Sequence, residues 1–172
     1  MGRILVLTNS SGGLYDFRNE FVQAMLSGHE VYVSMPDEVK KKELADEGCR
    51  IIKTAINRRG INPLEDFKLY REYRRLMRKL RPDLVVTYTI KPNIYGGLAA
   101  AGCKIPYIAT ITGLGGAFDR TGILLKLIVT MYRAGLKNAS CVFFQNEENK
   151  GIFNKLGIRA KKTRMVMGSG VN

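Results

Sequence analysis

The sequence predicts an α/β fold: a Rossmann-like, doubly wound, mostly parallel sheet of about seven strands. Short apolar or β-branched runs recur along the 172 residues, and helical patterns separate them. The first run, residues 4–7, is apolar throughout, as expected of a central strand covered on both faces. Glycine-rich turns follow this run and the run at residues 105–111. Because ligands of open α/β sheets bind at the carboxyl ends of strands, we expect the functional site at these turns.

The individual elements follow from local patterns. Strands are expected at residues 4–7, 29–34, 49–54, 84–88, 105–111, 140–145 and 163–167. Helices are expected at residues 17–28, 37–47, 63–80, 95–101, 122–137 and 146–157. The clearest helix start is at Asn62, an N-cap residue that is followed by Pro63 and by Glu65 at the capping-box position. With 45% hydrophobic residues, the chain suffices for one compact domain, and no apolar run approaches the roughly 20 residues of a membrane span.

The net charge of +13 predicts attraction to polyanions, whether nucleic acid, an anionic membrane surface or phosphorylated substrates. The helix at 63–80 carries six of the 28 lysine and arginine residues. Its expected core-facing side carries Phe67, Tyr70, Tyr73, Met77 and Leu80. The opposite side is cationic and is either a solvated face or a contact for anionic lipid or phosphate. That contact would comprise Arg58, Arg59, Arg71, Arg75 and Arg78, each contributing about 1 kcal/mol at an anionic surface.

The helix at 122–137 is apolar nearly all round, which predicts burial against the sheet or a partner, with insertion into a membrane interface as the alternative. Cysteines 49, 103 and 141 are odd in number, far apart and flanked by apolar residues, so we expect buried thiols in a reducing compartment. One histidine and scattered thiols leave no zinc site. We therefore expect no metal and no cofactor.

Three loops carry candidate ligand contacts. Gly12 and Gly13 allow close backbone approach beside the N–H groups of a helix start, although two glycines can also serve only a tight turn. Lys91 and Asn93 follow the fourth strand, where a lysine is placed for a phosphate or carboxylate, or is simply a surface lysine. A second glycine-rich turn spans 112–116. The spacing of the glycines in the first turn, Gly12 and Gly13, is not that of a dinucleotide-binding fingerprint. We expect the three loops to meet along one edge of the sheet.

Several stretches occur together in an order that resembles a known family. They are Gly12-Gly13, Gly28-His-Glu-Val31, Arg81-Pro-Asp-Leu-Val-Val86, Thr89-Ile-Lys-Pro-Asn-Ile-Tyr95, Ile111-Thr-Gly-Leu-Gly115, Val142-Phe-Phe-Gln-Asn-Glu147 and Gly168-Ser-Gly-Val-Asn172. Over essentially the whole chain they resemble the N-terminal half of family 4 (group 1) glycosyltransferases of the GT-B fold. The most similar subgroup makes capsular, O-antigen or lipid-linked oligosaccharides in bacteria.

The resemblance implies a division of labour between two domains. Residues 1–167 would be the acceptor-binding domain, and 168–172 the start of a linker to a C-terminal, donor-binding domain that is absent here, so that this fragment alone is expected to be inactive. The full enzyme would move a sugar, with retention and without a metal in the chemical step, from a nucleotide-sugar to a saccharide acceptor. The donor is expected to be UDP-linked and the acceptor to be attached to a polyprenyl diphosphate, at the cytoplasmic side of the inner membrane.

The resemblance also implies roles for individual residues. Gly12 and Gly13 would face the donor diphosphate. The acceptor and sugar side would be lined by Asp16, Lys91, Asn93, Thr112 and Gly113. Many relatives carry a histidine after the fourth strand, where this chain has Tyr88-Thr-Ile-Lys91, so no catalytic residue is assigned.

Other functions remain open at this stage. One is a stand-alone, membrane-associated binding subunit of a split glycosyltransferase. Another is a sugar-nucleotide epimerase of the same fold, which would act without an acceptor. A nucleic-acid-binding domain is favoured only by charge, because the chain lacks a reading helix or interleaved exposed aromatic residues, and we expect no nucleic acid partner.

Overall fold

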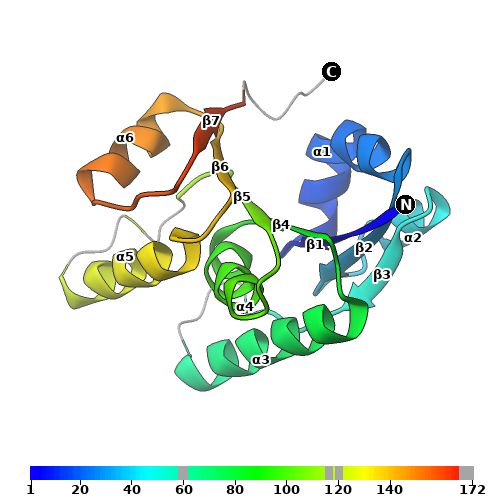
Figure 1. Ribbon diagram of the computed structural model, residues 1–172, viewed down its shortest axis with the longest axis horizontal. Helices are drawn as coiled ribbons and strands as arrows, with labels where there is room; N and C mark the ends of the chain where they lie inside the picture. The colour runs from blue at the N-terminus through cyan, green and yellow to red at the C-terminus, as the bar shows by residue number, and fades with distance from the viewer. Residues whose placement is uncertain (58–61, 115–117, 119–121, 167–172) are drawn as a thin grey trace.

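The computed structural model describes residues 1–57, 62–114, 118 and 122–166. In this part of the chain, seven strands form one sheet in the order β3-β2-β1-β4-β5-β6-β7, and every neighbouring pair is parallel (Figure 1). The strands are β1 (Gly2–Leu7), β2 (His29–Met35), β3 (Arg50–Lys53), β4 (Leu84–Tyr88), β5 (Tyr107–Ile111), β6 (Cys141–Phe144) and β7 (Thr163–Met165). The predicted fold class is confirmed.

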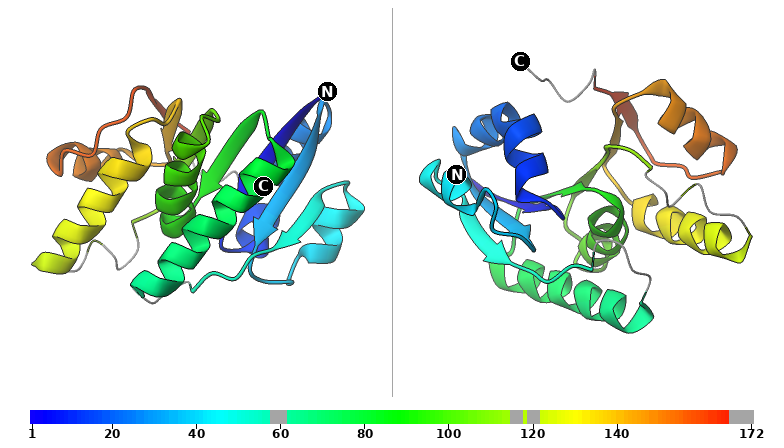
Figure 2. Two further views of the ribbon diagram at one scale, coloured as in Figure 1. Left: turned by 60° about the horizontal axis from the view of Figure 1, so that its bottom comes forward. Right: turned by 180° about the vertical axis from the view of Figure 1, so that it is seen from behind.

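Helices connect the strands and cover both faces of the sheet (Figure 2). They are α1 (Ser11–Leu26), α2 (Lys41–Asp46), α3 (Pro63–Leu80), the π-helical turn η1 (Pro92–Gly96), α4 (Gly97–Gly102), α5 (Ile123–Leu136) and α6 (Glu147–Lys155). In the described ranges, no helix combines the length and the apolar character that crossing a membrane requires.

Two apolar clusters hold these layers together. Strand β1 supplies both, because successive side chains point to opposite faces: Leu5 and Leu7 join the cluster under α3, α4 and α5, whereas Ile4 and Val6 join the cluster under α1 and α2. All four are at most 5% exposed. The strand at residues 4–7 is therefore covered by helices on both faces of the sheet, as its unbroken apolar run predicted.

Most predicted boundaries agree with the structure within a few residues, and α3 agrees closely. Asn62 caps this helix by accepting a hydrogen bond from the Leu64 N–H at 3.1 Å. Glu65 accepts instead from the Asn57 amide at 2.8 Å. The predicted core-facing side was wrong at Phe67, which is 57% exposed, because the buried side of α3 runs through Leu69 and Leu76 instead.

Helix α1 begins earlier than predicted. It starts at Ser11, so Gly12 and Gly13 lie in its first turn and not in a preceding loop. Ser10 is the N-cap, and its side chain accepts a hydrogen bond from the Gly13 N–H at 3.2 Å. Side-chain capping explains why the helix starts earlier. The Ser10 side chain satisfies a backbone N–H of the first turn, and the prediction, which relied on the spacing of apolar residues, could not detect this.

Small residues let η1, α4 and α5 approach the sheet and one another. A Cβ atom on Gly97 would lie 2.2 Å from the Gly135 carbonyl oxygen of α5, and one on Gly96 would lie 2.6 Å from Leu7 Cδ1 of β1. The Tyr107 hydroxyl of β5 donates to the same Gly135 carbonyl at 2.6 Å. The helix predicted at residues 95–101 is confirmed as α4, with the turn η1 at its start.

Candidate functional site at the carboxyl edge of the sheet

The parallel arrangement places the carboxyl ends of all seven strands at one edge of the sheet. Strands β1, β4 and β5 are consecutive in the strand order, so the three loops singled out in the sequence follow adjacent strands. Between β1 and β4 the winding direction of the sheet changes, which is where ligands bind in open α/β sheets. We call the loops after β1, β4, β5 and β6 the carboxyl rim; it comprises residues 8–13, 89–91, 112–114 and 145.

The start of α1 forms the first part of the rim. Its residue Ser11 is already hydrogen-bonded to Asp37 and to Lys40. The Ser11 N–H donates to both Asp37 carboxylate oxygens, at 3.1 and 3.3 Å. The Ser11 hydroxyl also donates to Asp37 and accepts from the Lys40 N–H at 2.9 Å. The anion expected beside the helix start is therefore, in part, the carboxylate of Asp37.

Neither Gly12 nor Gly13 is required by the conformation of α1. Neither has a positive φ. The nearest atom to a Cβ built on Gly12 would be Asp16 Oδ2 at 3.5 Å, and on Gly13 it would be a Ser10 side-chain atom at 3.6 Å, which are ordinary contacts. What the missing side chains provide is an open backbone surface at the rim, where another molecule can approach closely.

Arg18 joins the parts of the rim, and nothing in the sequence pattern singles it out. Its guanidinium carbon lies 5.0 Å from the centre of the Tyr88 ring, at the end of β4. Its Nη1 donates to the Gly13 carbonyl at 2.5 Å. In the amide orientation that satisfies both neighbours, Gln145 accepts from Arg18 Nη2 at 3.2 Å and donates to the Thr112 carbonyl at 3.2 Å. Arg18 thus contacts three segments directly, and it reaches the segment after β5 through Gln145.

The Arg18 guanidinium is held in a partly desolvated position. Burial lowers the pKa of Arg18, and burial raises the pKa of Tyr88 to about 12, although the nearby Arg18 charge opposes the latter shift. Among the described residues no carboxylate forms an ion pair with Arg18, and the helix is distorted at this residue (φ −145°, ψ 18°). A guanidinium in this state is suited to an anion that accepts two hydrogen bonds at once, such as a phosphate or a carboxylate.

The backbone is also unusual at the ends of β4 and β5. Thr89, a β-branched residue, has φ 72°, and its hydroxyl donates to the Tyr88 carbonyl. Gly113 has φ 151°, which favours glycine. Of the other predicted contacts, Thr112 follows β5 and is half-buried, whereas Asp16 lies in α1 and is exposed. Uncommon backbone conformations of this kind gather at binding sites.

Lys91 and Asn93 present no free polar group at the rim. The Lys91 ammonium forms an ion pair with Asp66 of α3 at 2.6 Å, and both side chains are largely buried. Asn93 is 1% exposed: it accepts from the Thr87 hydroxyl at 2.7 Å and donates to the Thr110 carbonyl at 3.0 Å. In this structure both side chains hold neighbouring elements together.

The remaining predicted contacts lie away from the rim. Arg58 and Arg59 fall outside the described residues. Three predicted arginines of α3 are exposed, namely Arg71, Arg75 and Arg78. One of them, Arg75, pairs with Glu72 at 2.8 Å on the same helix. The described residues contain no cluster of three or more His, Cys, Asp and Glu side chains that could hold a metal ion.

Comparison with known proteins shows which family this chain is similar to. The model of the glycosyl transferase 4-like family matches residues 3–146. A curated relative is the N,N'-diacetylbacillosaminyl-diphospho-undecaprenol alpha-1,3-N-acetylgalactosaminyltransferase of Campylobacter jejuni, which is 28% identical over 176 residues. The match covers 99% of this chain and 47% of the relative, so the chain spans about half the length of that protein.

Solved structures agree on the fold. An Anabaena protein, HepE, crystallised with UDP and glucose, superposes with a TM-score of 0.68 at 17% identity, covering 98% of this chain and 44% of that one. The UDP-GlcNAc 2-epimerase of Methanocaldococcus jannaschii superposes with a TM-score of 0.65 at 17% identity, covering 96% and 45%. At such identities these likenesses show the fold alone, which is one Rossmann-like half of a GT-B architecture. Because the family model covers most of the chain, this protein belongs to the glycosyl transferase 4-like family.

Proposed function

We propose that this chain is the acceptor-binding half of a glycosyltransferase that moves a sugar from a UDP-linked donor to a lipid-linked saccharide in bacterial surface polysaccharide synthesis. Family membership supports the transfer of a sugar. The name of the Campylobacter relative, which acts on a sugar diphosphate attached to undecaprenol, supports the class of acceptor. The observation that carries the proposal for this chain is the set of contacts through which Arg18 and Gln145 link the segments at the ends of β1, β4, β5 and β6.

The rim residues would divide the work between the two substrates. The open backbone at Gly12 and Gly13 would lie against the donor diphosphate. Arg18 would stabilise the negative charge that grows on the departing diphosphate, a contribution that matters most in a water-poor site. On the acceptor side Asp16, Thr112 and Gly113 would contact the sugar, while Lys91 and Asn93 would position the rim through their buried partners.

The opposite wall of the site would belong to a second domain. We propose that residues 1–167 form the acceptor-binding domain and that 168–172 lead into a C-terminal, donor-binding domain. The ratio of lengths supports this arrangement, since the chain covers 47% of the Campylobacter relative and 44% of HepE. Transfer would proceed with retention and without a metal or cofactor, and this half alone would be inactive.

The enzyme would work at the cytoplasmic face of the inner membrane, as a peripheral protein. The net charge of +13 and the exposed arginines of α3 favour binding to anionic lipid. We do not expect a nucleic acid partner. Two further functions deserve a test: an epimerase, because one solved epimerase shares the fold, and a stand-alone subunit that recruits a separate donor-binding protein.

The test is to express the complete reading frame and to incubate it with inner-membrane lipids and a panel of nucleotide-sugars. We expect a lipid-linked product that carries one added sugar. Release of an altered sugar from UDP-GlcNAc without any acceptor would instead establish the epimerase. A reading frame that ends at Asn172, with transfer only after a second protein is added, would establish the split enzyme.

Arg18 provides the accompanying variant. Replacing it with Gln removes a charged hydrogen-bond donor and should lower the rate of transfer roughly 10- to 100-fold. Arg18→Lys should recover part of the loss. The matched control is Arg159→Gln, since Arg159 is exposed on the segment between α6 and β7. Equal rates for Arg18→Gln and Arg159→Gln would remove Arg18 from the proposed site.

A further inference from the structure

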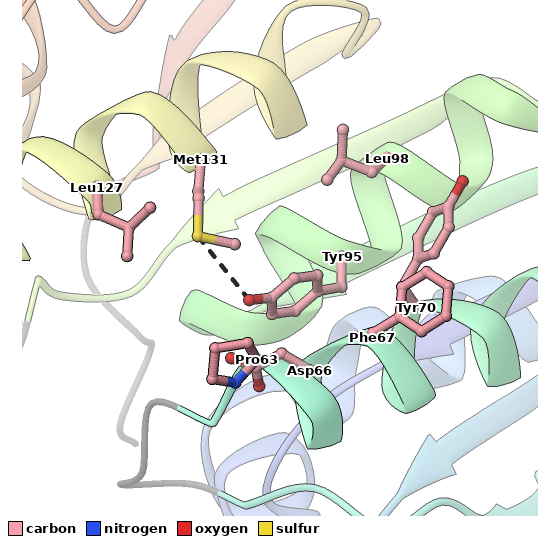
Figure 3. A pocket seen from close by; sticks show the side chains of 8 residues that line it. All are labelled: Pro63, Asp66, Phe67, Tyr70, Tyr95, Leu98, Leu127 and Met131. Atoms are coloured by element: carbon pink, nitrogen blue, oxygen red, sulfur yellow. Dashed lines mark hydrogen bonds between the residues drawn. The ribbon is translucent and has the colours of Figure 1, made fainter.

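A pocket of about 460 Å³ lies between α3, α4 and α5 (Figure 3). Its walls are Phe67 and Tyr70 of α3, Tyr95 and Leu98 of η1 and α4, and Leu127 and Met131 of α5. Figure 3 marks a weak hydrogen bond between two lining residues, from the Tyr95 hydroxyl to the Met131 sulfur at 3.9 Å. The volume lies in the range of roughly 300–1,000 Å³ that small-molecule sites occupy. We call this pocket and its mouth the α3–α5 groove.

Apolar side chains continue from the groove onto the open surface. Phe67 is 57% exposed and Leu127 is 45% exposed. One turn earlier on each helix lie Leu64, 74% exposed, and Ile123, 87% exposed. Exposed large apolar residues are ordinary when scattered, but four of them beside one apolar pocket mark a binding surface.

The groove opens beside the carboxyl rim. Helices α3 and α5 follow β3 and β5, so both begin at the edge of the sheet where the strands end. Phe67 lies in the first turns of α3 and Leu127 in the first turns of α5. The mouth of the groove and the carboxyl rim therefore lie at the same edge of the sheet, and Lys91 of the rim contacts Asp66, which lines the groove.

The polar groups at the floor of the groove are already occupied. Asp66 lines the groove but is paired with Lys91 at 2.6 Å, and the two side chains are 9% and 13% exposed. Burial, together with the hydrogen bond and charge of Asp66, raises the pKa of the Tyr95 hydroxyl, which therefore stays neutral. No free charge remains on this floor among the described residues. The groove thus suits an uncharged, apolar chain.

The surroundings favour a lipid over a protein segment as the occupant. The outer side of α3 carries an exposed cationic stripe, formed by Lys68, Arg71, Arg75 and Arg78. An apolar strip and a cationic stripe on one helix are complementary to the hydrocarbon and the anionic head groups of a membrane interface. The three aromatic rings in the walls give flat surfaces for branched, unsaturated hydrocarbon.

We propose that the α3–α5 groove binds the isoprenoid chain of the acceptor at its diphosphate-proximal end, so that the chain leaves the bilayer through the groove and the diphosphate reaches the carboxyl rim. This inference rests on the proposed lipid-linked acceptor and adds the place that recognises its lipid. The groove holds only the first part of the chain, and the remainder stays in the membrane.

The test compares soluble acceptors that carry the same saccharide diphosphate on a farnesyl chain or on a methyl group, using the complete reading frame. Leu127→Asp places a charge at an exposed wall position, and Val39→Asp is the matched control, because Val39 is 74% exposed and lies after β2. We expect Leu127→Asp to raise the KM for the farnesyl acceptor at least about tenfold with little change in kcat. Its KM for the methyl acceptor, and both values for Val39→Asp, should match the wild type.

Direct binding separates this inference from the proposed function. Titration calorimetry with farnesyl diphosphate should show binding that Leu127→Asp weakens at least about tenfold and Val39→Asp leaves unchanged, whether or not the wild type transfers sugar. Equal farnesyl affinity in both variants overturns the inference. So does a Leu127→Asp variant that loses binding to anionic vesicles yet keeps the wild-type KM for the farnesyl acceptor, since the surface would then bind only the bilayer.

Discussion

At the scale of single residues, Gly12 and Gly13 differ from Gly97 and Gly113, two glycines that the fold itself requires. Gly97 is needed because a side chain would collide with Gly135, and Gly113 is suited to its positive φ. Gly12 and Gly13 have neither reason, since their φ values are ordinary and a Cβ would find space. Gly28, Gly102 and Gly151 share this freedom. Gly12 and Gly13 differ from them in lying at the carboxyl rim, where we propose that another molecule approaches the backbone.

We predict that Gly13→Ala separates stability from activity. Alanine is the better helix former, so the free energy of unfolding should stay unchanged or rise by up to about 1 kcal/mol in urea denaturation. The rate of sugar transfer should fall at least about tenfold, because the new methyl group occupies the surface that the diphosphate approaches. Gly151→Ala in α6, where a Cβ would also meet nothing, is the control with full activity. Full activity in Gly13→Ala would contradict the assignment.

Lys91 has a structural contact as well as a predicted role at the site, because its ammonium pairs with the buried Asp66. We predict that Lys91→Ala destabilises the fold by roughly 3–5 kcal/mol, because it leaves the buried Asp66 carboxylate without its partner. The double variant Lys91→Met with Asp66→Leu should recover most of this loss. Urea denaturation of the single and double variants measures both. If Lys91→Ala is as stable as the wild type yet inactive, the lysine contacts substrate directly.

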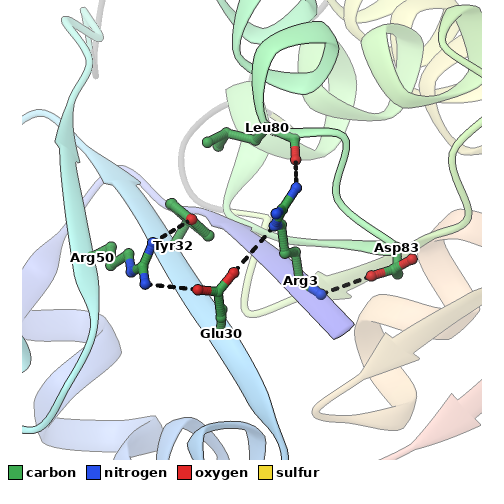
Figure 4. A network of polar contacts seen from close by, with 6 residues as sticks. All are labelled: Arg3, Glu30, Tyr32, Arg50, Leu80 and Asp83. Atoms are coloured by element: carbon green, nitrogen blue, oxygen red, sulfur yellow. Dashed lines mark hydrogen bonds and ion pairs between the residues drawn. The ribbon is translucent and has the colours of Figure 1, made fainter. Parts of the chain in front are cut away.

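At the scale of elements, the two edges of the sheet differ in how their charges are paired. At the amino edge, Arg3 donates to Glu30 at 3.1 Å, to the Leu80 carbonyl at 3.1 Å and, through its backbone N–H, to Asp83 at 2.7 Å (Figure 4). Arg50 pairs with Glu30 at 2.7 Å. These half-exposed contacts join β1, β2, β3 and the end of α3. At the carboxyl edge Arg18 has no such acidic partner among the described residues.

The contact between α4 and α5 depends on two glycines. We predict that Gly97→Ala costs at least about 1–3 kcal/mol, since its Cβ would lie 2.2 Å from the backbone oxygen of Gly135 and the two helices would have to separate. Gly28→Ala, where a Cβ meets nothing within 4 Å, is the matched control. Thermal unfolding of both variants measures the difference. An unchanged midpoint in Gly97→Ala would mean that the helices are not packed this closely.

The sequence predicted elements better than contacts between them. Strand β4 and the Asn62 cap could be predicted because apolar runs and capping residues act over a few neighbouring positions. The partner of Lys91 could not, because Asp66 is 25 positions away and on another element. Arg18 was missed for the same reason: its contacts with Tyr88 and Gln145 exist only after the sheet has formed.

At the scale of the whole molecule, five buried tyrosines make the stability of the fold depend on pH in the alkaline range. They are Tyr73, Tyr88, Tyr95, Tyr107 and Tyr132, and burial is the main cause that raises the pKa of each hydroxyl; for Tyr88 and Tyr107 the value is about 12. In the unfolded chain these hydroxyls titrate near pH 10. Between about pH 10 and 12 the unfolded chain therefore binds fewer protons than the native one.

We predict that the free energy of unfolding is independent of these groups below pH 10 and falls above it, by about 1.4 kcal/mol per pH unit for each such tyrosine. Tyrosinate absorbance should rise together with the loss of helical circular dichroism as the pH is raised. In Tyr107→Phe the free energy of unfolding should fall less steeply with pH, by the contribution of one tyrosine. Titration of all eight tyrosines near pH 10, with the fold intact, would contradict the described burial.

The central claim concerns the carboxyl edge as the wall that meets the acceptor, and hydrogen–deuterium exchange tests it most directly. The complete protein would be measured with and without an acceptor of the form saccharide-diphosphate-farnesyl. We predict slower exchange in the peptides that span residues 9–18, 88–93 and 111–114. Slower exchange confined to the amino edge, around residues 1–3 and 80–84, or no change at the rim under conditions where sugar is transferred, would contradict the account.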